Sequence, residues 1–354
     1  MSPSEAREPG AQFLAEIREQ PRALERLLER EADFGRVAAI ARERGTTIRL
    51  VGHGSSDNAA AYGMYAFGLL PGWTAMRDSI TLSVYYKASV DVSGSTVIAL
   101  SQSGKTRDVI EYVARAREKG AFTVAVTNDP ASELARAAEE VVALGAGIEK
   151  AVAATKTYTN QIAALALLAA HAAGQGPRYV DGLHDVIERL DSLIPELEQL
   201  VVPLAMQFAF VGRMFVIGRG TEFATAREIA LKLIETCRVA AEPLTATQLA
   251  HGPVAALDSL FPVWAIASRD ETLPSVIEAA GRIQAAGATL LASGTAADAI
   301  VGADHSIPIP LPSVPLLAPI LSVVPGQLFA WALARAKGLD PDVPRGLSKV
   351  TLAL

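Results

Sequence analysis

Short apolar runs alternate along the chain with longer segments in which apolar residues recur at helical spacing. In the first half the runs are TIRLVGHG from residue 47, STVIALSQ from 95, FTVAVTN from 122 and EVVAL from 140. Continuous apolar runs of this length are typical of strands buried on both faces, and Ala- and Arg-rich helical segments separate them. The alternation predicts an α/β protein with a parallel sheet covered by helices on both faces.

The same pattern recurs in the second half of the chain. Gly52-His53-Gly54 is matched by Gly218-Arg219-Gly220 at an offset of 166 (218 − 52). VIEYVARAREKGAFTVAVTN from Val109 is matched by VIEAAGRIQAAGATLLASGT from Val276 at an offset of 167 (276 − 109). An offset that stays constant to one residue over roughly 60 positions predicts two copies of one α/β domain.

Segments outside the repeat have patterns of their own. Apolar and charged residues alternate at helical spacing over 13–30, with an interruption at Pro21, and the connection between the copies has helical spacing that we expect to break near Pro195. The last residues carry too many turn formers for another layer, so they predict a tail lying over the rest. The expected organisation is an N-terminal helical arm (1–38), a first domain (39–180), connecting helices (181–204), a second domain (205–338) and a C-terminal tail (339–354).

Composition narrows the class of protein. Of 354 residues 50% are hydrophobic and 20% charged, and the net charge of −6 leaves no basic face for nucleic acid or anionic lipid. The apolar run over 161–173 is too short to span a bilayer and contains His171, so it predicts a buried helix and no membrane segment. A single cysteine, Cys237, and a polar N-terminus without a signal-peptide core predict a cytoplasmic protein without disulfides.

Small hydrogen-bonding residues end the run that starts at 95, in the order Ser101-Gln102-Ser103-Gly104-Lys105-Thr106. Ligands of open parallel sheets bind beyond the carboxyl ends of the strands, where a helix N-terminus offers free N–H groups. With Gly54-Ser55-Ser56 after an earlier strand, this loop predicts a phosphate monoester site; helix capping by serine is the commoner alternative for a single loop. The second copy has Ser268-Arg269-Asp270-Glu271 here, whose carboxylates would repel phosphate, so we expect the site in the first copy only.

Candidate catalytic groups gather in the second copy and the tail. Glu228, Lys232 and Glu235 share one face of an otherwise apolar helical pattern, AREIALKLIETC. A solvated face is the usual alternative, but the apolar remainder predicts that these charges face a cleft or an interface. His251 before Gly-Pro could exchange protons near neutral pH, and Lys349 could form a Schiff base, although a lone histidine is more often structural and a tail lysine usually lies at the surface.

No metal or cofactor site is expected. The five histidines, at 53, 171, 184, 251 and 305, include no pair at ligand spacing, and the chain has no nucleotide-binding glycine motif. Cys237 has no evident histidine partner, so we expect a small buried residue rather than a nucleophile.

Together and in order, these motifs resemble the sugar isomerase (SIS) domain family. The likeness is closest to the isomerase half of glutamine–fructose-6-phosphate aminotransferase and to stand-alone glucosamine-6-phosphate deaminases, and it runs over nearly the whole chain. It implies an α/β fold of two tandem SIS domains, each a doubly wound (flavodoxin-like) parallel sheet flanked by helices. The motifs are EIREQP at 16–21, GHGSS at 52–56, SQSGKT at 101–106, EKAVAATKTYTNQ at 149–161, GRG at 218–220, ALKLIET at 230–236, HGP at 251–253 and LSKVT at 347–351.

The resemblance also implies a role for individual residues. Glu235 would move a proton between sugar carbons 1 and 2, His251 would assist ring opening, Lys349 would approach the carbonyl and Lys232 would support them. In this family the histidine typically comes from the neighbouring subunit, which implies a homodimer with shared active sites. The implied substrate-binding residues are Ser56, Ser101, Gln102, Ser103, Thr106, Val152, Ala154, Thr155 and Glu228.

The activity implied is conversion of glucosamine 6-phosphate to fructose 6-phosphate and ammonia. The related synthase has a glutaminase domain with an N-terminal cysteine, whereas Met1-Ser2 opens directly onto the arm here, so glutamine-driven synthesis is disfavoured. Three departures from the family pattern, Lys105, Ile234 and Gln248, leave open an isomerase or deglycase of another sugar or amino-sugar 6-phosphate. A non-catalytic phosphosugar-binding regulator is the alternative from a different class.

Overall fold

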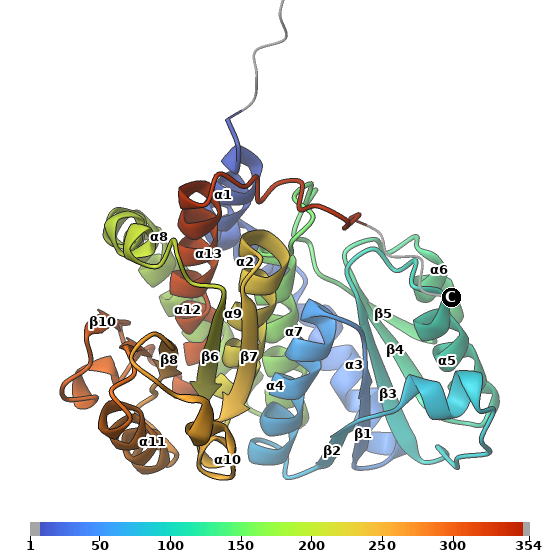
Figure 1. Cartoon of the computed structure of the whole chain (residues 1–354). Helices are drawn as coiled ribbons and strands as arrows, with labels where there is room; N and C mark the ends of the chain where they lie inside the picture. The colour runs from blue at the N-terminus through green and yellow to red at the C-terminus, as the bar shows by residue number, and fades with distance from the viewer. Residues whose placement is uncertain (1–7, 350–354) are drawn as a thin grey trace, which may run out of the picture.

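The computed structural model describes residues 8–349, which form two parallel five-stranded sheets covered by helices (Figure 1). The strand orders are β2-β1-β3-β4-β5 and β7-β6-β8-β9-β10, so both sheets have the same order when each is numbered from its own first strand. The predicted α/β fold with two copies of one doubly wound domain is therefore confirmed. The strands are β1 (Thr47–Val51), β2 (Thr74–Arg77), β3 (Ser95–Ser101), β4 (Phe122–Thr127), β5 (Glu140–Ala143), β6 (Arg213–Gly218), β7 (Ala240–Thr245), β8 (Val263–Ile266), β9 (Leu290–Gly294) and β10 (His305–Pro308).

The helices repeat in the same way. Helices α4, α5 and α7 of the first copy correspond in order to α9, α11 and α13 of the second. The α-helices are α1 (Ala11–Arg18), α2 (Gln20–Leu28), α3 (Glu31–Arg44), α4 (Ser55–Leu69), α5 (Arg107–Glu118), α6 (Glu133–Ala137), α7 (Lys156–Ala172), α8 (Gly176–Gln207), α9 (Glu222–Cys237), α10 (Ala246–Ala250), α11 (Leu273–Ala285), α12 (Ala318–Ser322) and α13 (Val324–Ala336). Single turns of π- or 3-10 helix lie at Thr81–Tyr85, Pro253–Ala256, Ala297–Ala299 and Pro315–Leu317.

The four strands expected in the first copy are all present. Every residue of β3 and β4 is buried, which explains why their sequences are continuously apolar rather than alternating. Strand β2, with the sequence TAMR, was not expected: it lies at the sheet edge, none of its residues is fully buried, and its sequence has no apolar run. Helix α7 is buried almost all round, as its apolar sequence predicts.

The expected break near Pro195 is wrong. Helix α8 continues for 32 residues, with Pro195 and Pro203 inside it. Pro195 is exposed, so water can satisfy the carbonyl group left without its helical partner. The apolar face continues on both sides of it through Leu190, Leu193 and Leu197, and its burial outweighs the roughly 3 kcal/mol that an interior proline costs.

The two copies meet through α4 and α9, which lie between the sheets (Figure 1). Helix α13 packs against α8 and α9; the stretch Pro315–Ala336 that contains it is apolar enough to cross a membrane, but 94% of its apolar window is buried, as in a core helix. After α13, the tail runs across the top of the view in Figure 1. Asp342 anchors it by accepting hydrogen bonds from the backbone of Gln12 (3.1 Å) and Phe13 (2.6 Å) at the start of α1.

The contact between α13 and α9 depends on a glycine. A Cβ on Gly326 would overlap the side chain of Ile229. We expect Gly326→Ala to lower the free energy of unfolding by about 1–3 kcal/mol, because the two helices would have to separate. Gly281→Ala on the exposed face of α11 has open space and should instead raise it by about 0.5–1 kcal/mol. Urea unfolding of both variants checks this; equal effects of the two would contradict it.

Candidate functional site

A cavity of about 420 Å³ opens at the carboxyl end of the first sheet and is enclosed by both copies and the tail. The first copy supplies the loops after β1 and β3 and the segment leading into α7. The second copy supplies Glu235 on α9, and the tail supplies Lys349. The predicted residues that line the cavity are Ser56, Ser101, Gln102, Ser103, Thr106, Val152, Ala154, Glu235 and Lys349.

The loop after β3 has the geometry of an anion cradle. Gly104 has φ +62°, and a Cβ there would overlap the Ser132 hydroxyl, so the loop requires glycine. Thr106 is the N-cap residue of α5, but its side chain makes no capping hydrogen bond; its Oγ1 lies 3.3 Å from Ser101 Oγ instead. The first N–H groups of α5 are therefore free of a side-chain cap, which favours an anion site over the capping alternative.

The loop after β1 contributes a second polar wall. Ser56 Oγ accepts a hydrogen bond of 2.9 Å from Gln161 on α7, which fixes the serine at the cavity. The Ser55 hydroxyl donates a hydrogen bond of 2.9 Å to Glu228 across the boundary between the copies. The loop therefore belongs both to the cavity and to the contact between the domains.

The predicted charged face of α9 lies at this interface. Lys232 is fully buried, with its Nζ 2.7 Å from Glu235 and 3.2 Å from Glu228. Burial lowers the pKa of Lys232, but the two carboxylates raise it by more, so the net shift is upward and the amine stays protonated. Glu235 is 21% exposed and lines the cavity. Glu228 lies beneath the cavity and accepts a hydrogen bond of 2.8 Å from the side-chain amide of Asn58.

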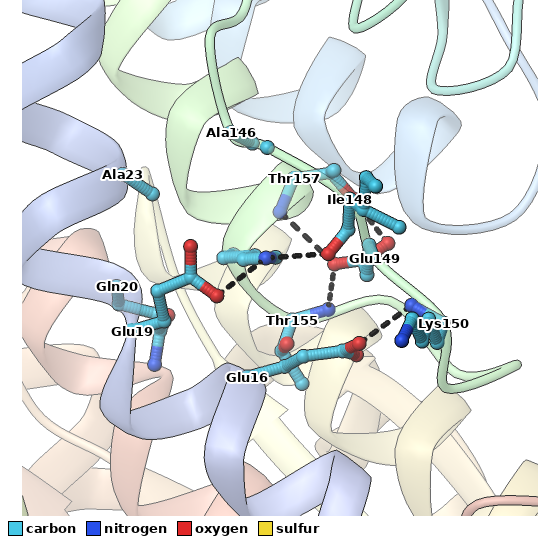
Figure 2. Close-up of polar contacts among 12 residues, drawn as sticks. Glu16, Glu19, Gln20, Ala23, Ala146, Ile148, Glu149, Lys150, Thr155 and Thr157 are labelled. Carbon is cyan, nitrogen blue, oxygen red and sulfur yellow. Dashed lines mark hydrogen bonds and ion pairs between the residues drawn. The ribbon is translucent and has the colours of Figure 1, made fainter.

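Glu149 is a residue that the sequence analysis did not single out. It is buried and accepts hydrogen bonds from the backbone of Thr155 (3.0 Å) and Thr157 (3.1 Å), as Figure 2 shows. Lys349 Nζ lies 2.6 Å from its Oε2 and 2.7 Å from the carbonyl of Ala151. Burial raises the pKa of Glu149, but the Lys349 ammonium and these hydrogen bonds lower it by more. Glu149 thus remains charged and holds the tail lysine at the cavity.

The arm holds the segment that contains Glu149. Glu16 on α1 accepts a hydrogen bond of 2.5 Å from the backbone N–H of Lys150 (Figure 2). Glu19 accepts one of 2.7 Å from Lys156 Nζ, which also donates to the carbonyl of Ile148 (2.7 Å). Thr155 is fully buried and immediately precedes α7, so it supports this segment and does not line the cavity. A short stretch EIREQ in a helical arm gives no local signal that its carboxylates bind a loop 130 residues away.

His251 lies elsewhere in the chain. It is exposed at the end of α10 and does not line the cavity. The predicted residues that the structure does bring together therefore come from the regions after β1 and β3, the segment before α7, helix α9 and the tail. A larger open hollow of about 740 Å³ adjoins the cavity and shares Gln102, Ser103, Glu149 and Lys349 with it.

The second copy fills the corresponding position with its own carboxylate. Glu222 corresponds to Ser56 (222 − 56 = 166), Ser268 to Ser101 (268 − 101 = 167) and Ser322 to Thr155 (322 − 155 = 167). The hydroxyls of Ser268 and Ser322 donate hydrogen bonds of 2.7 Å and 2.9 Å to the same oxygen of the buried Glu222. Burial raises the pKa of Glu222, and the hydroxyl donors offset part of that rise. An internal carboxylate at this position uses the two hydroxyl donors and opposes the binding of a phosphate.

Comparison with known proteins agrees with the division of the chain into two copies of one domain. The model of the SIS domain family matches twice, over residues 40–171 and 208–335. Glutamine–fructose-6-phosphate aminotransferase (isomerizing) of Thermus thermophilus is 33% identical over 350 residues, which cover 95% of this chain and 58% of that protein. The chain thus spans little more than half the length of this relative.

Two solved structures have the same fold. The C-terminal domain of glucosamine-fructose-6-phosphate aminotransferase from Francisella tularensis has a TM-score of 0.87 at 27% identity and covers 97% of this chain and 100% of its own. Glucosamine-6-phosphate deaminase from Thermotoga maritima has a TM-score of 0.79 at 19% identity, with the same coverage of both chains. At that identity the second likeness shows the fold alone.

The Glu149–Lys349 pair predicts a pH-dependent stability. Glu149→Gln should lower the free energy of unfolding by about 3 kcal/mol at pH 7, because the ammonium of Lys349 loses its buried partner. Folding lowers the pKa of Glu149 from its ordinary value of 4.5, so this carboxylate stabilises the protein fully at pH values above 4.5. The contribution is lost as the pH falls through the pKa of the folded state. Urea unfolding from pH 7 to pH 3 should therefore show the two proteins converging in acid.

The exposed pair of Glu278 and Arg282 provides the control. Glu278→Gln should cost less than about 0.5 kcal/mol at any of these pH values. A loss for Glu149→Gln no larger than that, or one that is constant with pH, would contradict the assigned role of Glu149.

Proposed function

The chain belongs to the SIS domain family, and we propose that it is a phosphosugar isomerase that deaminates glucosamine 6-phosphate to fructose 6-phosphate and ammonia. The observation that supports this most strongly is the cavity itself, where an uncapped helix N-terminus, a carboxylate and an ammonium surround one space of hexose size. The phosphate would lie at Ser101, Gln102, Ser103 and Thr106, with Ser56 beside them. The sugar would extend past Val152 and Ala154 toward Glu235.

Glu235 is assigned as the base. In the open-chain aldose the proton on carbon 2 is acidic because the neighbouring carbonyl delocalises the resulting charge. The Glu235 carboxylate removes that proton and returns it to carbon 1. The carbonyl oxygen gains a proton and the amine loses one, which converts the amino aldehyde into a ketose imine. Water then adds to the imine carbon, and ammonia leaves to give the ketose. Glu235 begins and ends this sequence as a carboxylate, and Lys232 at 2.7 Å stabilises that charge.

Lys349 is assigned as an electrostatic partner of the reacting carbonyl. Its amine donates to Glu149 and to the Ala151 carbonyl, so in this arrangement it is an ammonium. An ammonium aimed into a cavity stabilises the negative charge that develops on the carbonyl oxygen when carbon 2 loses its proton. Schiff-base formation would first require Lys349 to lose a proton and leave Glu149 unpaired. Glu228 and Thr155 are assigned supporting roles beneath the cavity.

Cys237 is not a candidate nucleophile for releasing ammonia from an amide. It is the single cysteine of the sequence, is buried, and its burial raises the pKa of the thiol to about 11. A thiol in that state is a poor nucleophile for glutamine hydrolysis.

A substrate with a larger substituent on nitrogen is the second candidate. The outer hollow that shares Gln102 and Lys349 with the cavity is also lined by the cations Arg30 and Lys105, by Arg26, which pairs with Glu19, and by the carboxylates Glu29 and Asp129. A ketosamine 6-phosphate carrying an anionic group could place that group there, and the same base would release the amine.

Ammonia release from glucosamine 6-phosphate tests the assignment. We expect turnover in the wild type and a loss of about a thousandfold or more in kcat for Glu235→Gln, with substrate binding kept within a few fold. Glu242→Gln on β7, outside the cavity, is the matched control. Unchanged turnover in Glu235→Gln would contradict the base assignment.

The other outcomes distinguish the alternatives. Release of amine from an N-substituted ketosamine 6-phosphate, without ammonia from glucosamine 6-phosphate, would favour the second candidate. Tight binding of hexose 6-phosphates without turnover of any of them would favour a phosphosugar-binding regulator.

His251 is assigned to the cavity of a second copy in a homodimer. If so, Glu235→Gln and His251→Gln proteins are each inactive alone, yet a heterodimer has one site with neither change. Mixing equal amounts after partial unfolding should restore about a quarter of the wild-type activity. Recovery would be absent if His251 acted within its own chain, and His251→Gln would be active by itself if His251 took no part. Sedimentation of the wild type measures the dimer directly.

A further inference from the structure

His53 and Asp108 form a pair at the cavity that the proposed reaction does not use. His53 follows β1 and lines the cavity, and its Nε2 lies 2.9 Å from Asp108 Oδ2 on the first turn of α5. The His53 side chain is 51% exposed, whereas that of Asp108 is 8% exposed. The two side chains therefore bridge the loops after β1 and β3 at the end of the cavity where the phosphate is placed.

Asp108 places a buried carboxylate beside the proposed phosphate site. A phosphate bound at a helix N-terminus gains from the positive dipole, and a buried carboxylate two residues past the N-cap opposes it. Within the described part of the chain, Asp108 Oδ1 is also buried without a hydrogen-bond partner. The carboxylate is thus poorly compensated as it stands, and a positive charge on His53 would satisfy both Asp108 and an incoming anion.

The repeat shows that the pair is specific to the copy with the cavity. At the same offsets His53 corresponds to Arg219 (219 − 53 = 166) and Asp108 to Ser275 (275 − 108 = 167). Ser275 donates to the backbone of Thr272 within its own helix turn. The second copy, which has Glu222 in place of an anion site, therefore has no counterpart of the pair.

We propose that His53 is a further ligand of the substrate phosphate, bound as an imidazolium between Asp108 and the phosphate dianion. Because Nε2 faces Asp108, Nδ1 is the ring nitrogen left for the ligand. In the neutral ring with Nε2 protonated, Nδ1 presents a lone pair, which repels a dianion; with a proton it donates a charge-assisted hydrogen bond. Asp108 is the positioning residue that orients the ring and compensates its charge. This inference rests on the proposed phosphosugar substrate.

The other charges around His53 are accounted for. Lys105 and Arg107 lie at the phosphate loop and are exposed, so solvent screens them. Asp57 on α4 pairs with Arg77 (2.8 Å) and Arg227 (2.6 Å). Across the cavity the remaining lining charges pair among themselves or with Lys232: Glu149 with Lys349, and Glu235 with Lys232. Asp108 is therefore the carboxylate, among the described residues, that contacts His53.

Proton uptake on binding tests the proposal without reference to turnover. At pH 8 a phosphate monoester is a dianion, and formation of the imidazolium on binding should draw a proton from solution onto His53. Calorimetric titration with fructose 6-phosphate and with inorganic phosphate, in two buffers of different ionisation enthalpy, gives the number of protons taken up. We expect roughly half to one proton per site in the wild type.

Variants separate His53 from the rest of the site. His53→Gln should abolish the uptake and weaken fructose 6-phosphate binding about tenfold at pH 7. Asp108→Asn should reduce the uptake while thermal unfolding shows a folded protein. His184→Gln, at an exposed position on α8, is the matched control and should behave as wild type.

The failures of the two proposals are distinguishable. Binding of fructose 6-phosphate without proton uptake, or equal uptake in His53→Gln, would overturn the role of His53 and leave the proposed function standing. No binding of either fructose 6-phosphate or inorganic phosphate to the wild type would overturn both.

Discussion

The cluster of buried charges between α4 and α9 is the constraint on which the rest of the site depends. Lys232 and Glu228 are completely removed from water, and Asn58 and Ser55 of the opposite copy donate hydrogen bonds to Glu228. Removing one partner from such a cluster costs about 3–5 kcal/mol, so the two copies are held in one relative position. That position brings Glu235 of the second copy over the anion cradle of the first.

The two copies share one backbone fold but differ in the charge at the carboxyl end of the sheet. In the first copy small hydroxyl residues and an uncapped helix leave room and donors for an external anion. In the second copy the donors at the same positions, Ser268 and Ser322, are used by Glu222. Under the proposed function, the duplicated fold separates its tasks: one copy supplies the phosphate site, and the other supplies the base from the helix that faces it. The tail completes the enclosure because Glu149, held by the arm, fixes Lys349.

Much of this could be predicted from sequence where the signal is local or periodic. The apolar runs predicted β1, β3, β4 and β5, and the constant offset predicted the second sheet. The loop at 101–106 stands out because small hydrogen-bonding residues follow one another at the end of a buried strand. The charged face of α9 stands out because the rest of that helix is too apolar for an exposed helix. Glu149, Glu222 and the His53–Asp108 pair were missed because their partners are distant in sequence. β2 was missed because an exposed edge strand needs no apolar run, and Pro195 misled because an exposed proline does not end a helix with a continuous buried face.

The central claim is that one ligand spans both copies, with its phosphate on the first and its reacting carbons at the second. A crystal structure of the Glu235→Gln protein with fructose 6-phosphate tests it most directly. The account predicts phosphate density at the loop 101–106, and carbons 1 and 2 within about 3.5 Å of residue 235. Phosphate bound beside Ser268 in the second copy, or a sugar turned away from α9, would contradict it.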